Sequence, residues 1–298
     1  MVTGKVSAKL INKDTGDVRW ESEPTPNTIG RNGKEMMLGK ITSQGAHNTL
    51  TMNSAGCHLL VYSATNFTTL VATLTNPTVS IQSSYTMRWV FEDNSTATYN
   101  IGSYVLKHTS WSAATPATNS FAYNNTNPQV TKEDNERLQV TWDIEVGAVT
   151  GLTNDARNSI CREVTADDAS QGNWGTPYLM MWTNAVGQNL VDDTPSGLDS
   201  YEGVAADNHN AFILMTDTLQ LDTPGANQVT LQFQISLGDE VYESQGGANY
   251  TYAGINNQNS ASAASRQIYR DTSGSSGVPN SGNKLDNRQW DWDLDITL

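Results

Sequence analysis

Charge, cysteine and long apolar runs are all scarce in this chain of 298 residues. Only 16% of the residues are charged, too few for a coiled coil or an acidic tail. Two cysteines, Cys57 and Cys161, allow at most one disulfide and do not make a zinc site by themselves. We interpret them as small buried hydrophobic residues.

The chain also lacks the segments that would place it in a membrane or mark it for standard secretion. No stretch approaches the roughly 18 consecutive apolar residues of a membrane-spanning helix. The opening segment MVTGKVSAKLINKDTG has no apolar core of the kind found in signal peptides. We therefore expect no membrane partner and no standard secretion.

Basic residues are few as well, and this bears on nucleic acid. The 17 Lys and Arg stand against 31 Asp and Glu, which gives a net charge of −14. A field of that sign repels phosphate backbones, so we expect no nucleic-acid partner. Residues 1–147 carry 11 basic and 12 acidic side chains, whereas residues 148–298 carry 6 and 19. The acidity belongs to the second half.

Sequence motifs for catalysis are missing. The four histidines show no metal-ligand spacing, and no GxSxG, GxxxxGK[ST] or GxGxxG occurs. Cys57 and His58 are neighbours in an expected strand, so their side chains point to opposite faces and do not form a nucleophile and base pair. We expect no enzyme, no catalytic residue, no cofactor and no metal centre.

What the chain has is a series of short β-favouring segments and many aromatic residues. Asn, Gly, Pro and Thr clusters bound the segments, a pattern typical of sandwiches and barrels. The expected strands of the first half include 5–12, 17–22, 58–64, 78–82 and 103–108. KDTG at 13–16 predicts a hairpin turn with Gly16 at positive φ. Apolar residues three to four apart predict short helices within 29–42 and 152–165.

Self-similarity indicates a tandem repeat. Four segment pairs recur in the same order: 29–42 with 152–165, 59–63 with 179–183, 85–91 with 229–235, and 135–146 with 287–298. The last pair alternates strictly between apolar and polar residues, as a half-buried strand does. The sequence therefore predicts an all-β fold with minor helix. It comprises two tandem β-sandwich or jelly-roll-like domains, 1–147 and 148–298, the second a diverged copy with an inserted acidic loop around 185–228.

Two sets of residues are candidates for an interface. Trp111, Trp174, Tyr250 and Tyr252 lie in polar, loop-like stretches, where they form a contact surface or cap a loop against their own domain. Asp291, Asp293 and Asp295 alternate with apolar residues and so share one strand face. That face is solvated or an interface, with a Ca²⁺ site or the paired carboxylates of a glycosidase as alternatives.

Four segments of the first half resemble a family of small structural proteins of tailed bacteriophages. They are KLINKDTGDV, NTIGRNGKEMMLGKIT, MRWVFEDNSTATYNIGSYVLKH and NPQVTKEDNERLQVTWDIEV. The resemblance implies a virion location, as a decoration, collar, adaptor or fibre-associated component of the head, neck or tail. It implies assembly with itself as a homo-oligomer and with other virion proteins, and no catalytic residues. We expect residues 1–25 to be an intersubunit arm.

Two other functions remain open from the sequence. The first is a receptor-binding or carbohydrate-binding module of a tail fibre, in which the loop aromatics and acids face a host surface glycan. A third, weaker alternative is a glycan hydrolase, which needs two carboxylates about 5 to 10 Å apart.

Overall fold

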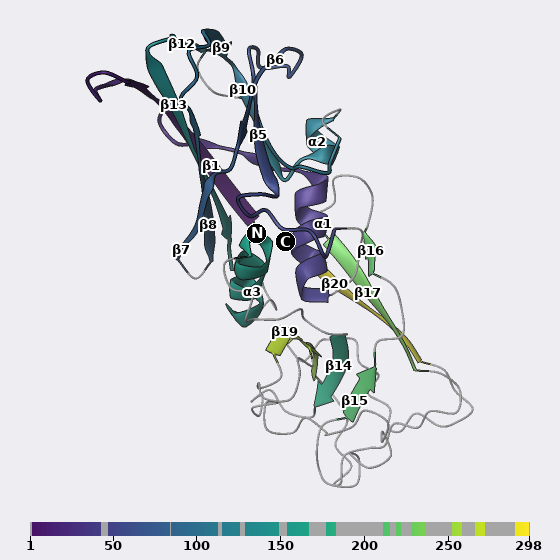
Figure 1. Cartoon of the computed structure of the whole chain (residues 1–298). Coiled ribbons are helices and arrows are strands. Elements are labelled where there is room, and N and C mark those ends of the chain that lie inside the picture. Colours follow the sequence, from purple (N-terminus) through teal and green to yellow (C-terminus); the bar gives the residue numbers. More distant parts are fainter. Residues whose placement is uncertain are drawn as a thin grey trace.

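The computed structural model describes residues 2–42, 47–83, 85–112, 115–125, 129–148 and 154–166, together with seven strands in the remainder (Figure 1). The described residues form several antiparallel sheets and only three helices. The prediction of an all-β fold with minor helix is confirmed at this level.

The larger sheet of the first half, here sheet A, has the strand order β2-β1-β13-β8-β7, and β3 also pairs with β1. β1 and β13 pair antiparallel along their whole length, from Val2 opposite Val146 to Asn12 opposite Glu136. β8 pairs with the other edge of β13. The bounds are β1 Val2–Asn12, β2 Val18–Glu21, β3 Thr25–Pro26, β7 Thr78–Ser83, β8 Thr86–Asp93 and β13 Glu136–Val146.

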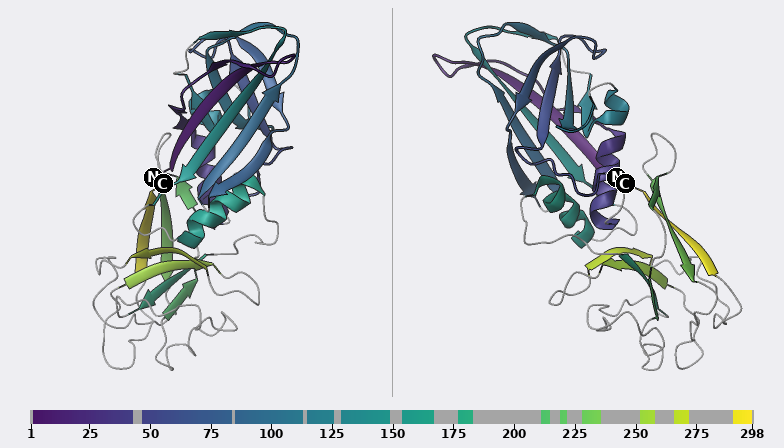
Figure 2. Two further views of the ribbon diagram at one scale, coloured as in Figure 1. Left: turned by 90° about the vertical axis from the view of Figure 1, so that its left-hand side faces the viewer. Right: turned by 45° about the vertical axis from the view of Figure 1, so that its right-hand side comes forward.

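Sheet B faces sheet A and has the order β4-β11-β10-β5-β6 (Figure 2). A separate two-stranded ribbon joins β9 to β12. The bounds are β4 Thr28–Ile29, β5 Cys57–Tyr62, β6 Leu70–Thr75, β9 Tyr99–Ile101, β10 Ser103–His108, β11 Ala122–Asn124 and β12 Val130–Lys132.

The predicted hairpin turn at 13–16 is present between β1 and β2. Gly16 has φ 78°, and its N–H donates to the carbonyl of Asn12 over 2.9 Å. The side-chain oxygen of Asn12 accepts hydrogen bonds from the backbone N–H groups of Asp14 and Thr15. This local pattern supports the pairing of β1 with β2.

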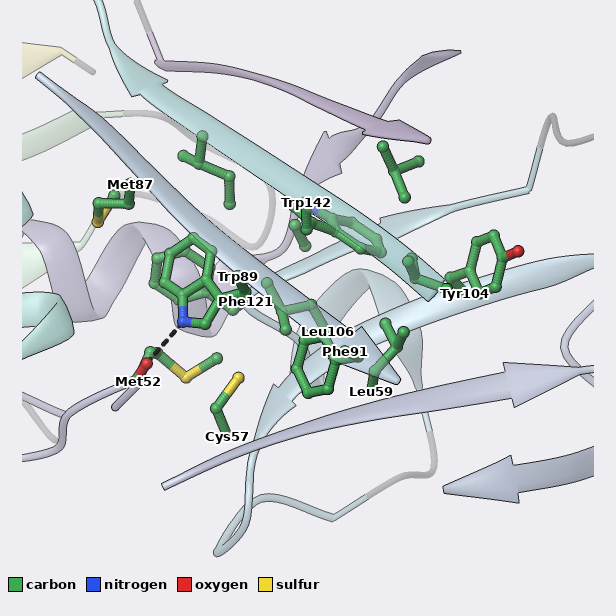
Figure 3. Packing of buried hydrophobic residues seen from close by; sticks show 14 of the residues in the cluster. Met52, Cys57, Leu59, Met87, Trp89, Phe91, Tyr104, Leu106, Phe121 and Trp142 are labelled. Carbon is green, nitrogen blue, oxygen red and sulfur yellow. Dashed lines mark hydrogen bonds between the residues drawn. The ribbon is translucent and has the colours of Figure 1, made fainter. Parts of the chain in front are cut away.

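The core lies between the two sheets. Alternate residues of β8 and β13 point into it, and Trp89 and Trp142 are directly opposite each other in the register. The indole N–H of the buried Trp89 donates to the carbonyl of Met52 over 2.6 Å (Figure 3). Cys57 and Cys161 are buried, as predicted, and both thiols are free. Burial raises the pKa of both thiols, that of Cys161 to about 12.

Helices α1 (Arg31–Thr42) and α3 (Asn154–Thr165) lie at one end of the two sheets, and the four-residue α2 (Pro116–Asn119) precedes β11 (Figures 1 and 2). Ile160 and Val164 of α3 belong to the same core cluster as the residues of sheets A and B. The backbone N–H of Met52 donates to the carbonyl of Val164 over 2.6 Å. Helix α3 lies after the domain boundary predicted between residues 147 and 148, yet it packs against the core of sheets A and B.

The start of α1 lies against the chain just before β11. The N–H groups of Gly30 and Gly33 donate to the carbonyls of Phe121 and Ser120 over 2.9 and 3.1 Å. These bonds satisfy donors at the helix start that have no partner within the helix. A Cβ atom at Gly33 would lie 2.3 Å from the Phe121 carbonyl oxygen, so this approach requires glycine.

After α3 the structure describes strands only. Two sheets form, with the orders β15-β14-β18-β19 and β16-β17-β20. Most of the expected inserted loop around 185–228 lies outside the described residues, and β15 and β16 fall inside its range. The bounds are β14 Pro177–Trp182, β15 Ala211–Leu214, β16 Leu219–Leu221, β17 Gln228–Ile235, β18 Tyr252–Asn257, β19 Arg266–Asp271 and β20 Trp290–Thr297.

Substituting Gly33→Ala should lower the free energy of unfolding by about 1–3 kcal/mol, although alanine favours helix by about 1 kcal/mol. The added methyl group forces the helix away from the Phe121 carbonyl. The control is Gly16→Asn, because nothing lies within 4 Å of Gly16 and asparagine tolerates positive φ. Urea unfolding followed by tryptophan fluorescence measures both. A Gly33→Ala protein as stable as the parent would contradict the close approach.

Candidate assembly surface

The last strand of sheet B and the last strand of sheet A follow one another directly in the chain. β6 is the last strand of sheet B and β7 the last of sheet A, and Asn76 and Pro77 alone separate them. Each strand uses one edge to pair inside its own sheet, β6 with β5 and β7 with β8. The other edge of each has no strand partner among the described residues. We call the segment Leu70–Ser83 the β6–β7 edge.

The β6–β7 edge contains no charged residue. No Asp, Glu, Lys or Arg occurs anywhere from Ile41 to Met87. The exposed positions of the edge are Leu70, with half of its surface accessible, and a series of Thr, Asn, Gln and Ser side chains. Exposed edge strands in soluble proteins are commonly protected by charges, prolines or short length. In β6 and β7 themselves none of the three applies.

The opposite edges of the same two sheets are protected. β2 carries Arg19 and Glu21, and these pair with Glu136 and Lys9 respectively. β3 contains Pro26, which has no N–H to donate. β4 is only two residues long. The contrast within one fold singles out the β6–β7 edge as a surface for binding another strand.

The loop before β6 is held in place from both sides. The N–H of Ser63 donates to the carbonyl of Thr69 over 2.9 Å, which closes the loop. Between them, Phe67 adopts φ 58°, a conformation unusual for a bulky residue. Its ring packs edge-on against Tyr62 and Tyr123, with centroids 5.7 and 5.9 Å apart. These contacts cover the outer face of sheet B and position Leu70 at the start of the edge.

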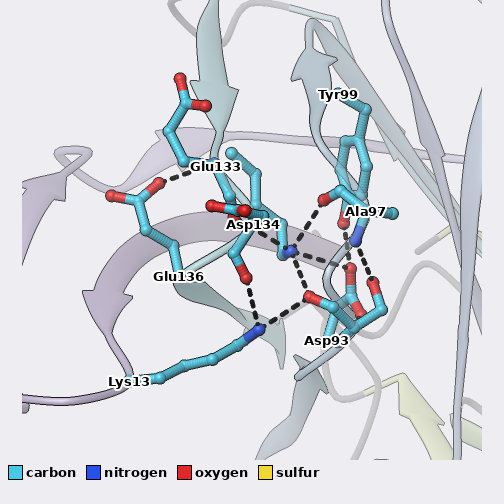
Figure 4. A network of polar contacts seen from close by, with 9 residues as sticks. Lys13, Asp93, Ala97, Tyr99, Glu133, Asp134 and Glu136 are labelled. Atoms are coloured by element: carbon cyan, nitrogen blue, oxygen red, sulfur yellow. Dashed lines mark hydrogen bonds and ion pairs between the residues drawn. The ribbon is translucent and has the colours of Figure 1, made fainter.

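A polar network that includes Asp93, Ala97 and Tyr99 connects the ribbon of β9 and β12 with the loop before β9 (Figure 4). Lys132 is fully buried, and its Nζ donates to the carbonyls of Ser95 and Ala97 over 2.7 and 2.9 Å. Asp93 lies 3.8 Å from the same ammonium group. Lys13 Nζ donates to the Ser95 carbonyl as well, over 2.9 Å, from an exposed position. The two cations together fasten the loop 94–98 between β8 and β9.

The network also sets the charge state of its members. Burial, together with the hydrogen bond to Asp93, raises the pKa of the Tyr99 hydroxyl. Burial opposes ionisation of Asp93, but hydrogen bonds from Tyr99 and Ser95 and the charge of Lys132 outweigh it, and the pKa of Asp93 is lowered. Burial lowers the pKa of Lys132. The raised pKa of Tyr99 and the lowered pKa of Asp93 keep Tyr99 as the donor and Asp93 as the acceptor of their hydrogen bond near neutral pH.

Trp111 is buried rather than exposed, with 7% of its surface accessible. Its ring packs against His47 and His108, with centroids 5.1 and 5.8 Å apart. Of the two interpretations given for Trp111, these contacts match packing against its own domain. Little of the ring is left for a partner to touch.

The other predicted interface residues lie in the second half. Trp174 and Tyr250 are outside the described residues, and Tyr252 is the first residue of β18. Asp291, Asp293 and Asp295 lie on β20, in register with residues of β17: Gln234, Gln232 and Thr230 respectively. Their role as interface residues stays a prediction.

Residues 1–25 are part of the sheet rather than an arm. β1 lies between β13 and β2, and its residues Val6, Ala8 and Leu10 are buried in the core. These residues do not form a free arm, because the alternating apolar pattern of β1 is matched to β13 of its own chain, and their contact with another subunit stays a prediction.

No family model, no curated protein and no solved structure matches this chain. In the part of the chain that the structure describes, no group of three or more His, Cys, Asp or Glu side chains is arranged to hold a metal ion. Among the same residues, none of the helices is long and apolar enough to cross a membrane.

The sequence reasoning above did not identify the β6–β7 edge. The available signal was the absence of charge from Ile41 to Met87, in a chain that carries 48 charged residues elsewhere. That signal becomes meaningful only when the pairing shows that two strands of this segment are edges.

Substituting Lys132→Met should lower the free energy of unfolding by about 2–4 kcal/mol, because the carbonyls of Ser95 and Ala97 lose a buried donor and Asp93 loses its ion-pair partner. The matched control is Lys13→Met, which removes an exposed donor to the same Ser95 carbonyl and should cost less than about 1 kcal/mol. Urea unfolding of the two variants compares them. Equal effects would contradict the role given to burial.

Stability should also fall on acidification below about pH 6.5, the ordinary histidine pKa. Burial and the nearby Lys107 lower the pKa of His58 and His108, so the unfolded chain binds protons first. His108 Nδ1 accepts a hydrogen bond from the Ser110 N–H, which protonation would break. This contribution is complete above pH 6.5 and is lost as the pH falls towards the lowered values.

Melting temperatures from pH 8 to pH 5 test this expectation. His108→Gln should melt with a shallower pH dependence than the parent over that range. A parent whose melting temperature stays constant or rises on acidification would contradict the expected sign.

Proposed function

We propose that this chain is a structural protein of a tailed-phage virion, an accessory component of the head, neck or tail that acts by protein–protein assembly. The observation that carries the proposal is the uncharged β6–β7 edge beside protected edges in the same sheets. Its partners are further copies of the chain and other virion proteins. Its location is the virion.

The edge supports assembly for a physical reason. An unpaired strand edge presents a row of N–H and C=O groups that a strand from another chain satisfies. A monomeric protein that exposes such an edge is at risk of aggregation, which charges on the edge prevent. An edge without charges is suited to a strand partner, and symmetry in a particle multiplies each contact.

We also propose that the two halves are diverged copies of one β-sandwich or jelly-roll-like domain. The order of pairing supports this. β6-β5-β10-β11 in the first half corresponds to β15-β14-β18-β19, and β7-β8-β13 corresponds to β16-β17-β20. A helix precedes the first strand of each series, α1 before β5 and α3 before β14. The four repeated sequence segments fall on these corresponding elements.

The resemblance of the first half to tailed-phage structural proteins supports the virion location. It rests on segments that form β1, α1, β8 to β10 and β13. Binding of a host surface glycan by a tail-fibre module is the alternative function, and the aromatic and acidic residues proposed for it lie mainly in the second half.

Light scattering of the purified chain, together with its copy number in purified particles, tests the proposed function. A discrete homo-oligomer present in many copies per particle is the expected result. A chain absent from particles would overturn the proposal, and glycan-array binding by that chain would favour the alternative.

A further inference from the structure

We propose that the β6–β7 edge pairs with the same edge of a second copy of this chain across a twofold axis. The inference rests on the proposed assembly function and names the partner and the contact. In the pair, β6 of one copy lies antiparallel to β6 of the other, and sheet B continues from one protomer into the next.

The geometry of the edge allows this pairing. β6 pairs regularly with β5 from Ala72 to Thr75, and β7 pairs regularly with β8 from Thr78 to Ile81. The register shifts lie outside these stretches, towards Leu70 in β6 and towards Ser83 in β7. The central part of each edge strand is therefore a regular template. A twofold axis makes such a contact self-complementary, with each surface meeting its own copy.

Side chains at the edge suit a homotypic contact. Thr73 and Thr75 are exposed on β6, and threonines opposite each other across a strand pair interact favourably. Leu70 is half exposed and gains burial when a second copy covers it. Val71, Ala72, Val79 and Ile81 are partly buried against the core, so the contact extends the core rather than opening it.

The charge distribution favours a second copy as the occupant. Two copies with a net charge of −14 repel each other unless their contact avoids acidic side chains. The first half is nearly neutral, with 11 basic and 12 acidic residues in 1–147, and the edge itself has no charge. A basic partner would be attracted to the acidic second half rather than to this edge. Electrostatic repulsion between two copies is smallest when the uncharged edge of the nearly neutral first half forms their contact.

The size of the contact requires both strands. A stable interface buries about 1,200–2,000 Å² in total, more than one pair of short strands provides. β6 and β7 follow one another through Asn76 and Pro77, and they terminate the two facing sheets. Because β7 continues the chain from β6, the proposed contact runs along β6 and onto β7 in each copy.

Two substitutions on β6 and one matched control test the inference. Leu70→Lys and Thr73→Lys each place two like charges close together across the proposed axis. Each should raise the dimer dissociation constant by about tenfold or more. The control is Val18→Lys on β2, because Val18 is a residue of the opposite edge of sheet A with the same 50% exposure as Leu70. Light scattering over a range of concentrations gives the mass, and circular dichroism confirms that each variant is folded.

Each outcome decides the inference. Folded monomers for both β6 variants beside a dimeric parent and a dimeric Val18→Lys would support it. An oligomeric parent that both β6 variants leave intact would overturn the inference while leaving the assembly function standing. Loss of the dimer in Val18→Lys as well would also overturn it. If the parent is monomeric in solution and binds particles through β6, the partner of the edge is another virion protein. That result would also overturn the inference.

Discussion

The structure depends on the pairing of β13 with β1 on one side and β8 on the other. β13 alternates strictly between buried and less buried residues, and both neighbours are aligned with it in register. Because a strand has a period of two, a slip of β13 by one residue would turn Trp142 out of the core and away from Trp89. The core between the sheets, the position of α3 and the direction of the hairpin at Gly16 all follow from this alignment.

The alternation of apolar and polar residues and the residue types at turns made many strands and turns of the first half predictable. The strands at 5–12, 58–64 and 103–108 and the positive φ of Gly16 were read from local patterns that the tertiary contacts reinforce. The partners of a segment were not predictable in the same way. The helix at 154–165 was expected to begin a second domain, but its apolar face packs into the core of the first half. Residues 1–25 were expected to reach a neighbour, but the nearest complementary strand is in the same chain.

The candidate site escaped sequence reasoning because it is defined by a missing property. Aromatic and acidic residues are the usual candidates for an interface when only the sequence is known. Trp111 was such a candidate, but it packs into its own domain. An uncharged strand is unremarkable until the sheet order shows it to be an edge. Lys132 was missed for a related reason, since only the fold brings the carbonyls of Ser95 and Ala97 around its ammonium group.

Assembly of the protein through the β6–β7 edge covers that edge. Backbone amide hydrogen exchange of the unmodified chain, compared between a concentrated and a highly diluted solution, measures this most directly. The account predicts that amides of residues 70–83 exchange more slowly in the concentrated solution, while those of β2 exchange at the same rate in both. Equal exchange of residues 70–83 at the two concentrations, in a protein that light scattering shows to associate, would contradict it.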